Sequence, residues 1–147
     1  DSIFEQASKW PHHQLLPILL SQKQYLKDAH VLVQTLENLH PPPDSFLFTV
    51  DVEDLYPTIP SKLGLEALRN IIIPHFSFSK TNLIYTLSVL VQEYHFLSFN
   101  NINYQQIKGT AMGRNFLIVY TCLFLAHLEN SQPPLFFTRY IDYNFSI

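Results

Sequence analysis

The chain has 147 residues, enough for one domain of ordinary size and too few for two. Hydrophobic residues make up 47% and charged residues 14%, which excludes a disordered chain and predicts a well-buried core rich in aromatic side chains. A single cysteine excludes an intrachain disulfide framework and a multi-cysteine zinc site. The formal net charge of −3 excludes a global attraction to nucleic acid or to an anionic membrane surface.

The ends of the chain and its apolar runs bear on its origin. The longest apolar run, residues 116–126, is shorter than the roughly 18–20 residues that span a bilayer, so we expect no membrane association. The first residues lack the basic start of a signal peptide, which favours an intracellular protein. The chain also lacks an initiating Met and stops directly after a strand-like run, so we interpret it as a piece of a longer protein.

The first forty residues predict a helical lead-in. Residues 21–39 carry apolar side chains at helical spacing, with Ser21 as a candidate N-cap. A run of three prolines follows, and then the segment 45–52, rich in β-branched and aromatic residues, predicts a strand. We therefore divide the chain into a helical segment, 1–40, and a main domain, 41–147.

The rest of the chain alternates helices and short strands. Ser61 and Ser79 are candidate N-caps of two successive helices. The dipeptide Asn100-Asn101 between two short apolar runs predicts a tight hairpin, because Asn tolerates positive φ. The expected segments are helices over 61–72, 79–94 and 115–130 and strands over 96–99, 102–107 and 135–142. This order predicts an α+β fold, a small antiparallel sheet with helices packed on one face.

Two carboxylates at the ends of apolar strands are the most informative residues. Strand alternation puts Thr49 and Asp51 on one face of the first strand, and Thr138, Tyr140 and Asp142 on one face of the last. If these two strands are neighbours, Asp51 and Asp142 converge at one edge of the sheet. Because a lone buried carboxylate is costly and Mg²⁺ prefers oxygen ligands, this pattern favours a phosphoryl-transfer metal site. The alternative is that each Asp merely ends a strand and faces water.

A glycine-bordered segment is the second indication of function. Gly109 and Gly113, two of only three glycines, flank residues 110–112 between a strand and a buried helix. A chain that otherwise avoids Gly needs unusual backbone angles, or close approach of another molecule, at this point. Lys108 and Arg114 border the segment, which fits a phosphate-bearing partner at a helix N-terminus. A tightly packed loop that leads into the helix fits equally well.

Three segments in series resemble the motifs of reverse transcriptases, most closely those of Penelope-like retroelements. Residues 48–60 resemble motif A, residues 106–113 resemble motif B, and Arg139-Tyr140-Ile141-Asp142 resembles the start of motif C. Upstream, residues 25–28 resemble a short segment that precedes motif A in these elements. The order and the gaps match, so the resemblance covers most of the chain.

The resemblance implies the palm domain of a right-hand polymerase, with segment 1–40 as the end of the fingers or connection. It implies that Asp51 and Asp142 are the catalytic ligands of two Mg²⁺ ions, with Mn²⁺ as a substitute, and that Tyr56 is a steric gate against a 2′-hydroxyl. In the intact parent, the implied partners are an RNA or DNA template–primer and a deoxynucleoside triphosphate (dNTP), joined by two-metal nucleotidyl transfer. The implied substrate-binding residues are Val52, Glu53, Asp54, Leu55, Tyr56, Gln106 and Gly109.

The departures from the family matter as much as the match. Tyr143 stands where the family has its second motif C aspartate, and a neutral phenol is a poor Mg²⁺ ligand. The basic fingers motif, the thumb and a nuclease domain have no clear counterpart. We therefore expect catalysis by this chain alone to be impaired. Two alternatives stay open: an inactive polymerase-like remnant that binds nucleic acid or protein as a scaffold, which Tyr143 favours, and an α+β interaction domain whose motif matches are accidental.

Overall fold

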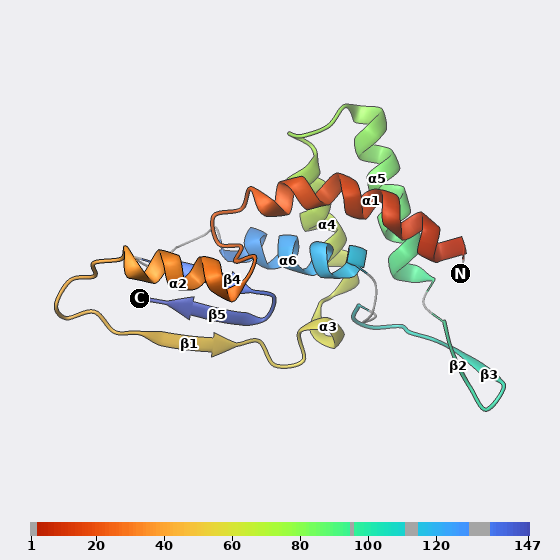
Figure 1. Ribbon diagram of the computed structural model, residues 1–147. Coiled ribbons are helices and arrows are strands. Elements are labelled where there is room, and N and C mark those ends of the chain that lie inside the picture. Colours follow the sequence, from red (N-terminus) through yellow and green to blue (C-terminus); the bar gives the residue numbers. More distant parts are fainter. Residues whose placement is uncertain (1–2, 95, 111–114, 130–135) are drawn as a thin grey trace.

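The computed structural model describes residues 3–94, 96–110, 115–129 and 136–147. These residues form six helices, a three-stranded antiparallel sheet and a separate two-stranded hairpin, which confirms the predicted α+β class (Figure 1). In chain order the elements are α1 (Ile3–Leu20), α2 (Ala29–Glu37), β1 (Phe48–Asp51), α3 (Leu55–Thr58), α4 (Ser61–Ile72), α5 (Phe78–Glu93), β2 (Phe96–Phe99), β3 (Ile102–Gln105), α6 (Asn115–Glu129), β4 (Phe137–Tyr140) and β5 (Tyr143–Ser146).

The sheet has the order β1-β5-β4, so its central strand is the last one in the chain. All pairings are antiparallel, and in their register Tyr143 lies opposite Asp51 on one side and opposite Tyr140 on the other. Main-chain bonds to the segment before α2 cover the outer edge of β4. The Arg139 amide donates to the Gln24 carbonyl at 2.7 Å, and the Leu26 amide donates to the Arg139 carbonyl at 2.8 Å. The segment between α1 and α2 therefore extends the sheet at this edge.

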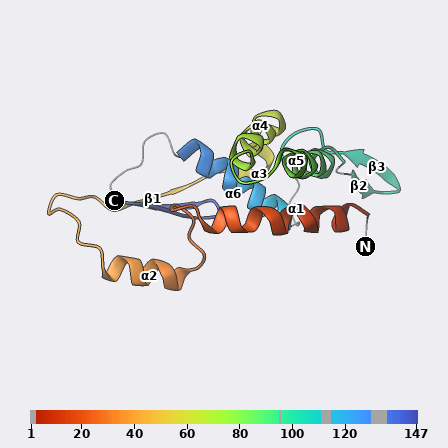
Figure 2. The same cartoon turned by 90° about the horizontal axis from the view of Figure 1, so that it is seen from above.

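The hydrophobic core lies where α1, α4, α5 and α6 pack together. Helix α6 is apolar nearly all round, and it was predicted to be buried for that reason. Its Phe116, Leu117 and Leu123 are fully buried, as is Leu15 of α1. Helix α2 lies apart from this cluster, on the opposite side of the sheet from α6 (Figure 2). No residue of α2 is buried. One face of the sheet is therefore covered by the core, and the other is only loosely covered.

The prediction for residues 21–39 is wrong in its boundaries. Asp28, and not Ser21, is the N-cap of α2, because the Asp28 carboxylate accepts a hydrogen bond from the Val31 amide at 3.0 Å. The Ser21 hydroxyl instead donates to the Ile18 carbonyl at 2.7 Å, directly after the end of α1. Helix α1, which contains two prolines, lies within the segment 1–40 that was predicted to be helical, although its bounds were not predicted.

The expected strand over 135–142 is also wrong. Strand β4 ends at Tyr140, the chain turns through Ile141 and Asp142, and β5 returns along β4. Asp142 is therefore a turn residue and does not share a strand face with Thr138 and Tyr140. Residue 135 lies outside the described residues.

The other elements agree closely with the expected segments. Helix α4 has the predicted bounds, although Pro60 occupies the N-cap position and Ser61 is the first helical residue. Ser77, and not Ser79, is the N-cap of α5. The hairpin turns at Asn100 and Asn101, whose φ values of 49° and 60° are those of a tight left-handed turn. No helix in the described part of the chain is both long enough and apolar enough to cross a membrane.

Close packing between α4 and α6 gives a first testable prediction. A Cβ added at Gly64 would overlap the Tyr120 hydroxyl and lie 2.8 Å from Tyr120 Cζ. We expect Gly64→Ala to lower the free energy of unfolding by about 1–3 kcal/mol, measured by urea denaturation. In a Tyr120→Phe background, which lacks the hydroxyl, the same substitution should be less destabilising. A double-mutant cycle with no coupling between the two positions would contradict this packing.

Candidate functional site

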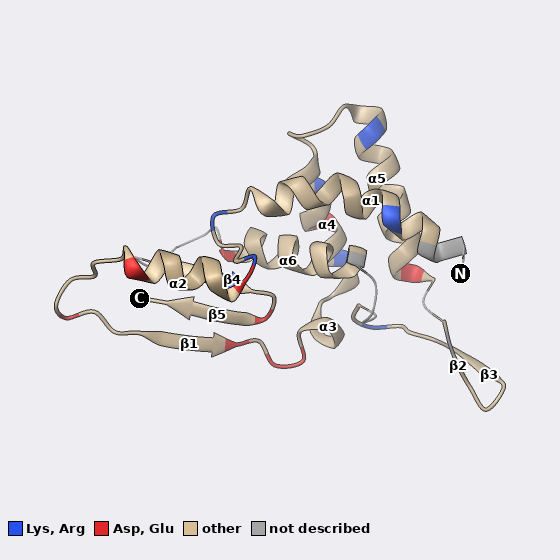
Figure 3. Cartoon of the chain, viewed as in Figure 1, with Lys and Arg blue, Asp and Glu red and all other residues tan. Residues whose placement is uncertain are grey.

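The two predicted carboxylates lie at one rim of the sheet. Strand β1 ends at Asp51, and the turn between β4 and β5 carries Asp142. The Val52 amide donates a hydrogen bond to the Asp142 carbonyl at 3.2 Å, so the chain just after Asp51 directly contacts the turn. Strands β1 and β4 are not neighbours, and the main chain of Asp142 reaches the end of β1 only because the turn brings the chain back to β1. In Figure 3, where Asp and Glu are red, the end of β1, the loop after it and this turn all carry acidic residues.

The turn that carries Asp142 has an unusual backbone. Ile141 has a φ of 57°, in the left-handed region. This region costs a non-glycine residue roughly 1–2 kcal/mol, and a β-branched residue is especially rare there. Nη1 of Arg139 donates to the Ile141 carbonyl at 2.8 Å, so a side chain from β4 holds the turn in this conformation.

Sequence analysis did not single out Arg139, although it is fully buried below this rim. Its Nε donates to Glu129 Oε1 at 2.6 Å, and its Nη2 donates to the Cys122 carbonyl at 2.9 Å. Both partners belong to α6. An arginine in an otherwise apolar strand was the available signal, because a charge in such a position needs a buried partner.

Asp51 faces the side of the sheet that is turned away from α6. By strand alternation and register it shares this face with Thr49, Tyr140 and Tyr143. These residues line a pocket of about 340 Å³ that also includes Leu32 of α2. Asp51 is exposed and Asp142 is half-buried. The face is therefore mainly apolar and aromatic, with a carboxylate at its rim.

Tyr56 and Gly109 lie together beside the rim. The Thr110 amide donates to the Tyr56 carbonyl at 2.7 Å. Gly109 has a φ of 75°, and a Cβ there would lie 2.5 Å from the Pro57 Cα, so only glycine fits this approach to α3. The pKa of Tyr56 is raised above its ordinary value mainly by burial, and further by Cys122 and Asp142.

Other predicted substrate contacts are arranged less favourably. Leu55 is 4% exposed and belongs to the core. The Val52 amide is already bonded to Asp142. Glu53 and Asp54 are exposed beside the rim. The Val52 amide and the Leu55 side chain are therefore not available to bind a phosphate.

The motif B-like loop lines a different hollow. Gln106 and Gly109 line a pocket of about 420 Å³ between the end of α5 and the segment after β3. The side-chain Nε2 of Gln106 donates to the Lys108 carbonyl at 2.9 Å. Gly113 and Arg114, which border the loop, lie outside the described residues. No contact joins Gln106 to the carboxylates among the described residues.

The donor set limits the metal that could bind. Within the described ranges, no group of three or more His, Cys, Asp or Glu residues is arranged to hold a metal ion. Asp51 and Asp142 offer two carboxylates. Mg²⁺ commonly takes one or two protein carboxylates and completes its shell with water and substrate phosphates. Two carboxylates are a donor set suited to an ion that is shared with a phosphate substrate, and they are too few for a cage made by the protein alone.

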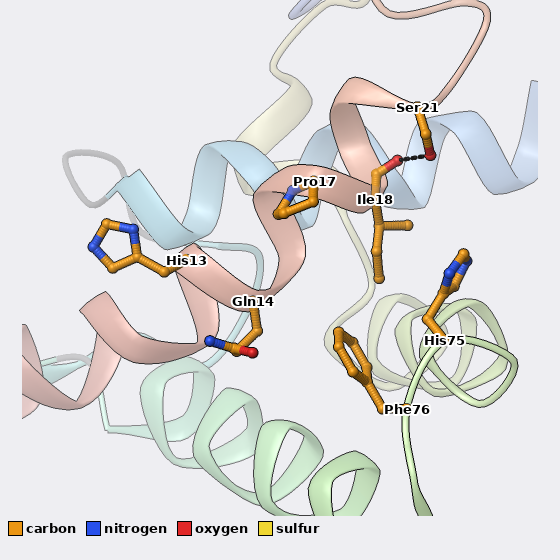
Figure 4. Close-up of a pocket in the computed structure, with 7 residues that line it drawn as sticks. All are labelled: His13, Gln14, Pro17, Ile18, Ser21, His75 and Phe76. Carbon is orange, nitrogen blue, oxygen red and sulfur yellow. Dashed lines mark hydrogen bonds between the residues drawn. The ribbon is translucent and has the colours of Figure 1, made fainter.

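A further pocket lies far from the rim in the fold, between α1 and the turn after α4 (Figure 4). Its volume is about 400 Å³. His13 and Pro17 come from α1, and His75 and Phe76 come from the opposite wall. None of the described residues that line it is a carboxylate, and it shares no residue with the rim.

Comparison with known proteins assigns the chain to no family. No protein-family model matches the sequence, and no curated protein matches it. A function for this chain must therefore be argued from the geometry of the rim and from the resemblance of its motifs.

The strained turn leads to the second prediction. We expect Ile141→Asn to raise the free energy of unfolding by up to about 1 kcal/mol, because Asn adopts the left-handed region more easily than a β-branched residue. The change would be measured by thermal unfolding. Ile107→Asn is the matched control, since Ile107 is 94% exposed and does not have a positive φ. An equal gain in both variants would mean that the turn is not strained.

Proposed function

We propose that this chain is the palm segment of an RNA-directed DNA polymerase of the reverse transcriptase type. The observation that carries the proposal is the contact between the Val52 amide and the Asp142 carbonyl. It sets the end of the motif A-like strand against the motif C-like turn, although these segments are far apart in the sequence. The motif B-like loop is joined to the motif A-like segment by the bond between the Thr110 amide and the Tyr56 carbonyl.

In this proposal Asp51 and Asp142 supply the carboxylates for divalent cations at the rim. When bound, Mg²⁺ lowers the pKa of the primer 3′-hydroxyl and neutralises charge that develops at the α-phosphate of the dNTP. Asp51 is exposed and can reach a ligand outside the sheet, whereas Asp142 is held by its turn. Tyr56, half-buried in the segment that follows β1, would limit the space beside the sugar of an incoming nucleotide.

The charge at the rim indicates what other parts of a longer protein must supply. Glu53 and Asp54 are exposed beside the carboxylates and would repel a triphosphate. The net charge of the whole chain is also negative. In the proposed polymerase, the basic residues that bind the triphosphate and the template–primer therefore belong to other domains, and this chain supplies the metal-binding rim.

Tyr143 favours a second candidate function, a polymerase-like remnant that serves as a catalytically inactive scaffold. In register Tyr143 lies directly opposite Asp51, on the same face of the sheet, and its side chain is 63% exposed. Where the family has a carboxylate, this chain presents a phenol toward the same space. Metal binding distinguishes the two candidates, because a scaffold has no need of it.

The third prediction tests the metal-binding rim. We expect the chain to bind Mn²⁺, followed by electron paramagnetic resonance, and Asp51→Asn to weaken this binding at least tenfold, or about 1.4 kcal/mol. Asp142→Asn should have a similar effect. Glu66→Gln is the control, because it removes an exposed charge from α4. Equal affinity in wild type and both aspartate variants would eliminate the polymerase proposal.

The fourth prediction concerns the position opposite Asp51. Tyr143→Asp adds a carboxylate directly opposite Asp51, on the same face of the sheet. We expect it to tighten Mn²⁺ binding by about tenfold or more, because an additional negative charge lies close to the cation. Tyr143→Asn introduces a side chain of the same size as aspartate without its charge, and it should leave the affinity near that of wild type. If both substitutions act alike, charge at this position does not contribute to the site.

A further inference from the structure

The guanidinium of Arg139 connects three parts of the fold. All three of its nitrogens donate: Nε to Glu129, Nη1 to the Ile141 carbonyl and Nη2 to the Cys122 carbonyl. The three distances lie between 2.6 and 2.9 Å. The side chain is 0% exposed, so the charge has these partners in place of water. Two of the partners are on α6, and the third is in the turn that carries Asp142.

The bond to the turn acts directly on the peptide group that leads into Asp142. The carbonyl of Ile141 and the amide of Asp142 belong to the same planar unit, so fixing the oxygen fixes the orientation of that plane. Without this bond the left-handed conformation of Ile141 would have less to stabilise it. The next carbonyl, that of Asp142, accepts the bond from Val52. A continuous series of contacts therefore leads from α6 through Arg139 to the end of β1.

We propose that Arg139 is a positioning residue for the metal-binding rim: by holding the Ile141 carbonyl, it sets the position of the Asp142 carboxylate relative to Asp51. The inference rests on the proposed function for its chemistry, although the geometry of the turn can be tested independently. Glu129 has a supporting role, because its carboxylate balances the guanidinium and holds it against α6.

Lysine cannot replace arginine in this role. A guanidinium presents its donors in a rigid plane that reaches three acceptors at once, whereas an ammonium is a single point charge on a flexible stem. Arg139→Lys would keep the positive charge near Glu129 but leave at least one of the two carbonyls, of Ile141 or Cys122, without its donor. The substitution therefore separates the charge of residue 139 from its hold on the turn.

The test compares Arg139→Lys with Leu123→Ala in the 147-residue chain. Leu123 is fully buried in α6, so its truncation also destabilises the fold, without removing a bond to the turn. At temperatures well below both unfolding transitions, we expect Arg139→Lys to weaken Mn²⁺ binding at least tenfold and Leu123→Ala to change it less than twofold. Equal losses in the two variants, or no loss in Arg139→Lys, would overturn the inference.

Hydrogen exchange at the Val52 amide gives a readout that needs no metal. This amide bonds to Asp142, so we expect it to exchange at least tenfold faster in Arg139→Lys than in Leu123→Ala. Should wild type bind no Mn²⁺ in an Asp51-dependent way, the proposed function fails, while the exchange rate still decides whether Arg139 holds the turn. Unchanged exchange in Arg139→Lys rejects the positioning role whatever the metal does.

A second variant covers the case in which Arg139→Lys does not fold. Glu129→Gln keeps an acceptor for Arg139 Nε but removes the balancing charge. We expect it to increase exchange at Val52 and to weaken Mn²⁺ binding by a smaller factor, about two- to fivefold, because the guanidinium is held less firmly. Wild-type exchange and wild-type affinity in Glu129→Gln would show that this ion pair stabilises the interior without affecting the rim.

Discussion

A buried ion pair between Arg139 and Glu129 joins the last strands of the chain to the central helix. Taking an ionised group out of water costs several kcal/mol unless its charge and all its donors are matched. The surroundings of Arg139 balance its charge with one carboxylate and give each of its three nitrogens an acceptor, two of them main-chain carbonyls. The same residue also pairs through its backbone with the segment that includes Gln24 and Leu26. Arg139 thus connects strand β4 to helix α6, to the turn after β4 and to the segment between α1 and α2.

The parts of the fold that could be predicted from sequence are those in which local preference and tertiary packing agree. Helix α6 is apolar enough to be recognised as buried, and Asn100-Asn101 marks its hairpin because both residues tolerate a left-handed backbone. The turn at Ile141 has no such local signal, since a β-branched residue disfavours that conformation. It forms because Arg139 and β5 stabilise it. The Arg139 side chain is in turn held by Glu129 and Cys122 of α6, and this packing cannot be predicted from the residues of the turn.

The candidate site was predictable to a similar extent. A carboxylate at the end of an apolar strand is conspicuous, so Asp51 and Asp142 could be found by residue type alone. Their neighbours were harder to predict: Leu55 matches a motif position, yet its side chain fills the core. Residue type and spacing locate a group along the chain, but they do not show which of its atoms are already bonded. That limit explains why Val52 matches a motif position although its amide is already bonded to the Asp142 carbonyl.

The position of β5 at the centre of the sheet affects how the protein can be made. Strand β1 has no sheet partner among the described strands except β5, which follows it only after four further helices and three further strands. Until β5 is synthesised, β1 is an unpaired strand next to the apolar side chains of Phe46 and Leu47, and such segments tend to associate with other chains. Closing such long loops is slow in comparison with forming helices. A nascent chain of this sequence is therefore prone to aggregate through β1 until β5 is available to pair with it.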